Sequence, residues 1–283
     1  MLNLRPSGPA FRVPHRVSAD RLLHMALLNG HPADPDALRT LALTNYGHFT
    51  SMRVDDQHVR GLTRHLERLV RDCHSVFGAD LDPGLVRRYV RDAVGDKPGA
   101  FVVRVTILDP GLDIARPADA SDPHVLVTHR PAGALPLPPL RVKTVRYQRD
   151  VAQVKHAGLF GALHHRRAAQ LAGFDDALFV GPDELVSEGG TWNVGFIDAN
   201  GSVVWPKADV LPGVTMALLQ ERHVHSVAPV PVDHLPEMQA AFATNTTIGV
   251  RAISAIDDAH VPTEHPALVE LRESFLALRG EQL

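Results

Sequence analysis

Cysteine is almost absent from this chain, since Cys73 is the only one among 283 residues. A single cysteine excludes an intramolecular disulfide bond. Cys73 falls on an apolar helical stripe, so we interpret it as a buried small hydrophobic residue rather than a catalytic thiol. No apolar run approaches the roughly 18 residues of a membrane span, and Arg and Pro interrupt the first 20 residues where a signal peptide needs an apolar core. We therefore expect a cytoplasmic protein that does not enter a membrane.

Motifs for metals and nucleic acids are also missing. The 17 histidines lie mostly alone or beside arginines, and neither HExxH nor a Cys/His ligand spacing occurs. The formal net charge is −3, with both signs interspersed, whereas nucleic-acid binding needs a clustered basic face. We expect no metal and no nucleic-acid partner. A hydrophobic share of 45% and a charged share of 22% are typical of an ordinary globular protein.

Short strands alternate with amphipathic helices from residue 28 onward, which predicts an α/β fold of the α+β type. The segment 130–140 (RPAGALPLPPL) contains four prolines, so it cannot continue a helix or a central strand. We therefore place a boundary there. The predicted organisation is an N-terminal extension (1–26), a small α/β domain (27–130), a Pro-rich interdomain linker (131–140) and a larger domain (141–283).

Several elements can be predicted from local patterns. Apolar residues recur at helical spacing over 62–77, and Gly78 follows as a stop signal. The sequence Asp-Ala-Asn-Gly at 198–201 lies between two β-rich runs and is typical of a hairpin turn. Further predicted elements are strands at 49–54, 100–108 and 124–128, helices at 83–94 and 157–172, a helix after Pro212, and β segments near 242–256.

The residues that indicate a catalytic or binding function lie between 150 and 250. Lys155 follows a β-prone stretch, SEGGTWNVGF (187–196) contains Glu188 and Asn193, VLPGVT (210–215) opens a helix, and ATNTT occupies 243–247. Each of these alone has an ordinary interpretation, as a surface lysine, a turn, a helix cap or an edge strand. Their order and spacing are the informative feature.

Together these motifs resemble the class IV aminotransferases, the fold-type IV enzymes that use pyridoxal 5′-phosphate. His65-x-x-Arg68-Leu69 matches the family's H-x-x-R-L element, and the resemblance covers about residues 27–258. It implies a two-domain fold with a larger, C-terminal, β-barrel-like domain with helices, and a homodimer. LNGHPAD near residue 28, GHFTSMRV at 47–54 and the Lys-His pair at 155–156 are most similar to the aminodeoxychorismate lyase branch.

The resemblance also implies roles for individual residues. Lys155 is expected to bind the cofactor as a Schiff base and to act as the catalytic base, since a lysine in a dry pocket can be deprotonated. Glu188 would face the pyridine nitrogen and keep it protonated, and Asn193 would orient the site. The expected phosphate contacts are the Arg68 guanidinium, the backbone amides of Val214 and Thr215 at a helix N-terminus, and the hydroxyls of Thr215 and Thr246.

Contacts to the substrate are less well marked. Arg104 and the amide of Thr247 are the expected partners of the substrate carboxylate, although Arg104 can also be read as a salt-bridged or solvent-facing strand residue. Arg53, Arg146 and Arg149 are weaker candidates for that carboxylate. His156 is a candidate proton relay, and Trp192 either walls the cofactor pocket or fills the core.

The sequence departs from the family at two points. A tyrosine often meets the cofactor ring hydroxyl, but the comparable residues here are Phe49 and Phe160, so that Tyr46 or a water would have to substitute. The family's arginine after GVT is Met216. An aminotransferase that moves an amino group between an amino acid and a 2-oxo acid is the favoured function. The alternatives are a lyase that releases pyruvate from aminodeoxychorismate, and a non-catalytic protein on the same fold.

Overall fold

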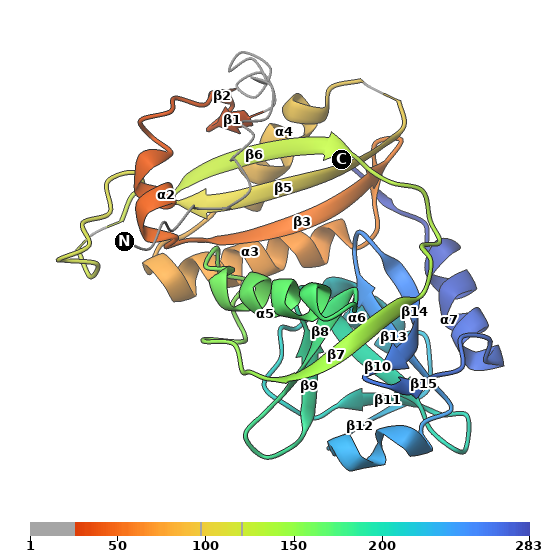
Figure 1. The fold of residues 1–283 in the computed structure, drawn as a ribbon. Coiled ribbons are helices and arrows are strands. Elements are labelled where there is room, and N and C mark those ends of the chain that lie inside the picture. The colour runs from red at the N-terminus through yellow and green to blue at the C-terminus, as the bar shows by residue number, and fades with distance from the viewer. Residues whose placement is uncertain (1–25, 97, 120) are drawn as a thin grey trace, which may run out of the picture.

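The computed structural model describes residues 26–96, 98–119 and 121–283 (Figure 1). The predicted N-terminal extension, residues 1–26, therefore lies outside the described residues except for Ala26. The rest of the chain forms a seven-stranded and a nine-stranded sheet with helices packed against them. None of the described helices is long and apolar enough to cross a membrane.

The first sheet has the strand order β16-β4-β3-β5-β6-β1-β2. Its centre is an antiparallel run of β3 (His48–Asp55), β5 (Ala100–Leu108) and β6 (His124–Pro131). The shorter strands are β1 (Ala26–Leu28), β2 (His31–Pro32), β4 (His58–Val59) and β16 (Glu281–Gln282). Since β16 belongs to this sheet, the C-terminal end of the chain returns to the N-terminal half of the fold, outside the second sheet.

Side-chain alternation along β3, β5 and β6 gives the first sheet two different faces. One face packs against α3 (Leu62–Phe77) and α4 (Pro83–Val94), and it provides Met52, Val103 and Val127 to a buried cluster with helix residues. The short helix α2 (Arg39–Thr44) precedes β3. Both long helices have the predicted bounds, because α3 ends at Gly78 with positive φ and α4 begins with Asp82 capping the amide of Gly84.

The second sheet closes into a six-stranded barrel, because β9 pairs with both β8 and β10. Buried side chains from all six strands of this ring meet in one hydrophobic cluster, so the predicted β-barrel-like unit is confirmed. The ring strands are β7 (Leu140–Arg146), β8 (Asp176–Val180), β9 (Val186–Gly189), β10 (Asn193–Ile197), β13 (Ala240–Asn245) and β14 (Gly249–Ile256). Outside the ring lie β11 (Val203–Pro206), β12 (His225–Ala228) and β15 (Ala259–His260).

Helices and one 3₁₀ turn surround the barrel (Figure 1). They are α5 (Phe160–Leu171), α6 (Val214–Gln220), η1 (Val232–Glu237) and α7 (Pro266–Leu276). The predicted hairpin at 198–201 is confirmed, since it joins the antiparallel strands β10 and β11. The predicted helix at 157–172 is shorter than expected and begins only at Phe160.

Backbone hydrogen bonds connect the first sheet to the segment around Lys155. The outer edge of β3 is free near Phe49, because β4 pairs only with Val54 and Asp55. The segment before α5 uses this edge: the amide of Phe49 donates to the carbonyl of Lys155 over 2.8 Å, and the amide of Ala157 donates to Gly47 over 2.7 Å. The lysine is therefore fixed against the first sheet although it follows a strand of the second.

Candidate active site

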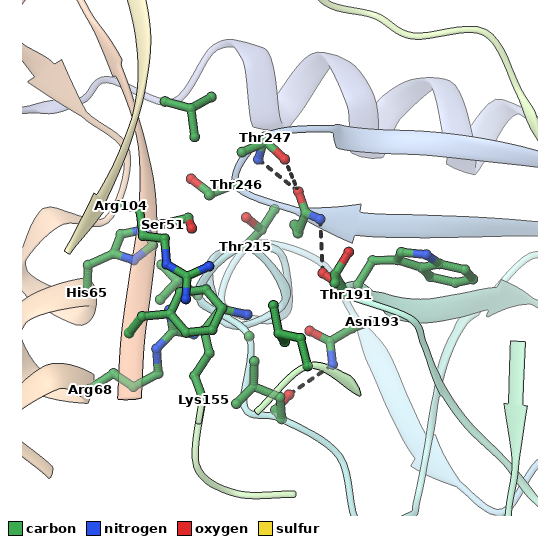
Figure 2. A pocket seen from close by; sticks show the side chains of 18 of the residues that line it. Ser51, His65, Arg68, Arg104, Lys155, Thr191, Asn193, Thr215, Thr246 and Thr247 are labelled. Carbon is green, nitrogen blue, oxygen red and sulfur yellow. Dashed lines mark hydrogen bonds between the residues drawn. The ribbon is translucent and has the colours of Figure 1, made fainter. Parts of the chain in front are cut away.

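A cavity of about 390 Å³ lies where the two sheets meet. The face of β3, β5 and β6 that points away from the helical core provides one wall, and loops of the barrel provide the other. The nine residues predicted for catalysis or as the main cofactor and substrate contacts line this cavity, namely Arg68, Arg104, Lys155, Glu188, Asn193, Val214, Thr215, Thr246 and Thr247. The weaker substrate candidates Arg53 and Arg146 do not line it, and they pair with Asp55 and Glu184 instead. Residues separated by up to 179 positions in sequence are thus brought together, as Figure 2 shows for most of them.

The Lys155 side chain extends into the cavity beneath the Phe49 ring, with its Nζ atom 4.9 Å from the ring centroid. Its backbone amide donates to the Asp72 carboxylate over 3.1 Å, which fixes the base of the side chain. Burial, and then the positive charges of Arg68 and Arg149, lower the pKa of Lys155 to about 7. A nucleophilic, neutral amine is therefore available near neutral pH.

Glu188 is buried on β9 with both carboxylate oxygens hydrogen-bonded. Arg149 Nη1 donates to Oε1 over 3.2 Å, and the amide of Leu211 donates to Oε2 over 3.2 Å. Burial raises the pKa of Glu188, whereas the charge and hydrogen bond of Arg149 lower it. The carboxylate is thus held in the pocket by an adjacent cation, and it also raises the pKa of Lys155.

Arg149 has a different partner from the substrate carboxylate that the sequence suggested. It was a candidate for binding the substrate carboxylate, but its guanidinium pairs with Glu188 and also donates to the carbonyls of Ala152 and Val154. It therefore connects Glu188 to the segment that leads into Lys155. No sequence pattern marks this pair, because the partners are 39 residues apart, Arg149 in a connecting segment and Glu188 on β9.

Asn193 joins the barrel to the turn before α6. Its Nδ2 donates to the carbonyl of Leu211 over 2.9 Å, and a Cβ on Gly213 would lie only 2.0 Å from its Oδ1. Only glycine allows this close approach of the turn to Asn193. The predicted orienting role has a concrete form here, in that Asn193 positions the turn that precedes Val214 and Thr215.

Arg68 reaches the cavity from α3 and is 6% exposed. Its Nη2 donates to the Thr50 hydroxyl over 2.5 Å, whereas its Nε has no partner among the described residues. Burial lowers the pKa of Arg68 to about 10, which leaves it charged at neutral pH. Thr215 on α6 and Thr246 in the β13–β14 turn face the same part of the cavity (Figure 2). These groups form an anion-binding corner.

Arg104 lies flat on Phe49, with its guanidinium carbon 3.6 Å from the ring centroid. Its Nε donates to the Thr106 hydroxyl over 3.1 Å, and within the described parts of the chain it forms no salt bridge. Burial lowers its pKa. The interpretation of Arg104 as a salt-bridged strand residue is therefore wrong, and the cation is directed at the cavity.

The Thr247 amide, the expected partner of the substrate carboxylate, has a partner within the chain in this structure. This amide donates to the Asn245 side-chain oxygen over 2.8 Å, and the Thr247 hydroxyl donates to the same atom (Figure 2). Asn245 itself donates from Nδ2 to the carbonyl of Thr191 over 3.1 Å. The sequence could not reveal this, because an Asn two residues earlier in a turn competes for the amide only once the turn has formed.

Two residues considered for the ring hydroxyl also lie elsewhere. Phe160 is 83% exposed at the start of α5, and the Tyr46 hydroxyl donates to the carbonyl of Val76 over 3.0 Å. Of Phe49, Phe160 and Tyr46, Phe49 is the one that lines the cavity. His156 lines it too, with its Nε2 bonded to the carbonyl of Asp150. Trp192 both lines the cavity and is buried, with an exposed fraction of 4%.

Sequence reasoning passed over His65, which it used only as part of a motif. His65 is 1% exposed, its Nδ1 lies 2.8 Å from the Thr50 hydroxyl, and its Nε2 has no partner among the described residues. Burial, and then the charges of Arg68 and Lys155, lower its pKa well below the ordinary value. The sequence signal that could have identified it is its position three residues before Arg68, which puts both side chains on one face of the predicted helix.

The charges of the cavity favour a ligand with more than one anionic group. Among the described residues that line the cavity, Arg68, Arg104 and Lys155 are basic, and the one acidic residue, Glu188, is already paired with Arg149. The residues fit pyridoxal phosphate on three counts: an arginine nitrogen without a partner among the described residues in the anion-binding corner, a lysine of lowered pKa, and a buried carboxyl group paired with an arginine. No group of His, Cys, Asp or Glu in the described residues is arranged to hold a metal ion.

Comparisons with known proteins agree with this geometry. The family described as amino-transferase class IV matches residues 47–256. Among solved structures, the fold is similar to the branched-chain aminotransferase of Thermoproteus uzoniensis (18% identity, 89% of this chain and 93% of that one, TM-score 0.79). It is also similar to a hypothetical aminotransferase from Mycobacterium tuberculosis in a PLP-bound form (19% identity, 90% and 98%, TM-score 0.77).

A third similar structure is the fold IV transaminase CpuTA1 from Curtobacterium pusillum (23% identity, 84% of this chain and 88% of that one, TM-score 0.72). No curated protein sequence matches the chain significantly. At these identities the structural likeness establishes the fold, and the family match covers the strands and loops that form the cavity.

Proposed function

Because this chain belongs to the class IV aminotransferases and uses pyridoxal 5′-phosphate, we propose that it moves an amino group between an amino acid and a 2-oxo acid through a covalent link at Lys155. The observation that supports this most directly is the Lys155 amine, whose pKa is lowered to about 7 in a cavity that also contains the ion-paired Glu188. The Lys155 amine is therefore about half neutral at pH 7, and Arg149 lowers the pKa of the buried Glu188 carboxyl against the larger effect of burial.

Bound pyridoxal phosphate supplies an electron sink for the charge that develops when the Cα–H bond of an amino acid breaks. Among the described residues that line the cavity, Lys155 is the one lysine, so its Nζ is the group that would attach the cofactor. Once an amino acid has displaced it, the free amine can take the Cα proton and return it, because its lowered pKa suits proton transfer in both directions near neutral pH.

Glu188 would hold the ring nitrogen of the cofactor in its protonated form. The charge and hydrogen bond of Arg149 lower the pKa of this carboxyl against the larger effect of burial, and the Leu211 amide fixes its orientation. The Arg68 guanidinium, the start of α6 and the Thr215 and Thr246 hydroxyls would bind the phosphate, since all four lie in the anion-binding corner. Asn193 supports α6 through its contact with Leu211.

Arg104 is the proposed anchor for the substrate carboxylate. It lies on the wall of the cavity made by the first sheet, and its stacking on Phe49 holds the planar guanidinium in one orientation. A preorganised arginine loses little side-chain freedom when a carboxylate binds. The Thr247 amide is not included, because Asn245 already accepts its hydrogen bond.

The attachment point can be tested by borohydride reduction of the purified enzyme, followed by digestion and mass spectrometry. The pyridoxyl group should be found on Lys155, and Lys155→Ala should abolish this label. Lys143 and Lys207 are the internal controls. A label on either of them in the wild-type protein would refute the assignment.

The reaction type can be tested with the same preparation. In an aminotransferase, a donor amino acid alone should release one oxo acid per site, because the amino group stays on the cofactor. A lyase of this family would instead release pyruvate from aminodeoxychorismate over many turnovers without a second substrate. Absorbance and an oxo-acid assay on glutamate, alanine and a branched-chain amino acid distinguish the two outcomes.

We also propose that the chain acts as a homodimer in the cytoplasm, and that residues 27–130 and 141–283 form two units joined by 131–140, apart from the last strand, β16, which pairs with β4 of the first unit. The homodimer follows from the family resemblance, and the linker from its prolines. Sedimentation should give twice the mass of 30.8 kDa. Limited proteolysis that cuts within 131–140 would support the division into units.

A further inference from the structure

Two side chains on α3 point into the cavity side by side, and only one of them has a role so far. His65 and Arg68 are three residues apart, and residues at this spacing lie on the same face of a helix. Both are buried and line the cavity (Figure 2). Thr50 on β3 connects them, since its hydroxyl lies 2.8 Å from His65 Nδ1 and accepts from Arg68 Nη2 over 2.5 Å.

This connection fixes which nitrogen of His65 has the hydrogen. Arginine can only donate, so Arg68 occupies a lone pair of the Thr50 hydroxyl oxygen. The hydroxyl hydrogen then needs an acceptor, and His65 Nδ1 is the one that the structure places within hydrogen-bond distance. We therefore assign Nδ1 as the nitrogen without a hydrogen.

The other nitrogen of His65 is then a donor. Burial and the nearby charges of Arg68 and Lys155 lower the pKa of His65, which keeps the ring neutral at neutral pH. A neutral imidazole that accepts at Nδ1 has its hydrogen on Nε2. Nε2 is buried and has no hydrogen-bond partner among the described residues, and a buried unpaired N–H is unfavourable unless a ligand pairs with it.

We propose that His65 is a phosphate ligand: its Nε2–H donates to the phosphate of the cofactor, beside the guanidinium of Arg68. This inference rests on the proposed function and assigns one further residue to the same site. A neutral donor suits the position, because a second cation next to Arg68 and Lys155 would face like-charge repulsion when the phosphate is absent. The Thr50 bridge ties His65 to Arg68, whereas Arg104 bonds to Thr106 instead.

Two substitutions separate a role toward the phosphate from a role toward Thr50. In His65→Asn, the short amide can still meet Thr50 but cannot reach the position of Nε2. In His65→Gln, the longer side chain can place an amide donor near Nε2 but no longer matches Nδ1. A ligand role predicts that Gln is tolerated and Asn is not, and a purely structural role predicts the reverse.

The measurement is the dissociation constant of pyridoxal phosphate from the apoenzyme, determined by absorbance titration. We expect His65→Asn to weaken binding about ten- to a hundredfold, the usual range for losing a hydrogen bond to a charged group. His65→Gln should stay within about threefold of wild type on the same reasoning. Pyridoxal, which lacks the phosphate, should bind wild type and both variants with similar affinity.

Three results would overturn the proposal. They are unchanged pyridoxal phosphate affinity in His65→Asn, equal losses of pyridoxal and of pyridoxal phosphate affinity, and a raised KM for the amino acid with normal cofactor binding. ¹⁵N chemical shifts of His65 in the apoenzyme provide a separate check, since a hydrogen on Nδ1 would also contradict it.

The proposed function and this inference can fail separately. Borohydride labelling of wild-type Lys155 tests the function and does not depend on His65. If Lys155 is labelled and His65→Asn binds pyridoxal phosphate normally, only the role of His65 is wrong. If Lys155 is not labelled, the function itself is wrong.

Discussion

The lowered pKa of Lys155 makes a quantitative prediction about its reactivity. Burial and the charges of Arg68, Arg149 and Arg104 act in one direction, and Glu188 acts in the other, to give a pKa of about 7 in place of 10.5. At pH 7, an amine with a pKa of about 7 is about half neutral, whereas an ordinary lysine is neutral in roughly one molecule in 3000. The neutral fraction is thus about a thousandfold larger.

Competitive labelling of the apoenzyme with trace acetic anhydride between pH 5.5 and 9.5 measures this effect. Only the neutral amine reacts, so the rate at each lysine follows its neutral fraction after normalisation. The Lys155 profile should rise through a midpoint near pH 7 and become flat above roughly pH 8. Lys207, an exposed lysine, provides the reference profile in the same digest.

Glu188→Gln gives the matching perturbation. The negative charge of Glu188 raises the pKa of Lys155, so its removal should shift the labelling midpoint of Lys155 to lower pH and leave Lys207 unchanged. A Lys155 profile that rises in parallel with that of Lys207 up to pH 9 would refute the lowered pKa of Lys155. A shift to higher pH in Glu188→Gln would contradict the assigned sign.

Three further predictions concern single side chains. Arg68→Ala should weaken pyridoxal phosphate binding by roughly ten- to a hundredfold while pyridoxal binding changes little, because the lost contact is to the phosphate; equal affinity for pyridoxal phosphate in both proteins would make Arg68 a structural charge. Glu188→Gln should still bind the cofactor but slow Cα proton removal, which a larger isotope effect with an α-deuterated donor would reveal; near wild-type turnover would exclude this role. Arg149→Met should lower the free energy of unfolding by about 3–5 kcal/mol in a denaturant titration, since it leaves the buried Glu188 unpaired. The double variant with Glu188→Gln should recover part of that loss. No recovery would show that the hydrogen bonds of Arg149 to Ala152 and Val154 contribute more to stability than the ion pair with Glu188.

Local patterns determined most of the secondary structure. The helix over 62–77 was predictable to the residue, because apolar spacing, a following glycine and the lack of a breaker all act within a few turns. The hairpin at 198–201 was predictable for the same reason. The late start of α5 was not, because the chain between Lys155 and Phe160 is held by β3, which is more than 100 residues away.

The motifs also identified the members of the site. Lys155, Glu188 and Arg68 each lie in a short element whose residue types and order are distinctive, and all three line one cavity. Sequence order predicts such membership because each motif places its own backbone locally. It does not predict which side chains of different motifs meet.

Tertiary structure alone decided those pairings. Arg149 was a candidate for the substrate and pairs with Glu188 instead, and the amide of Thr247 bonds to Asn245. The bridge from Arg68 through Thr50 to His65 joins a helix to a strand. Hydrogen bonds and pKa shifts depend on distances of a few ångströms and on burial, and neither exists until the sheets and α3 have packed. The sequence by itself therefore determined the longer elements of the first sheet and its helices, the family and the main residues of the cavity, and the packing determined what each charge and each N–H faces.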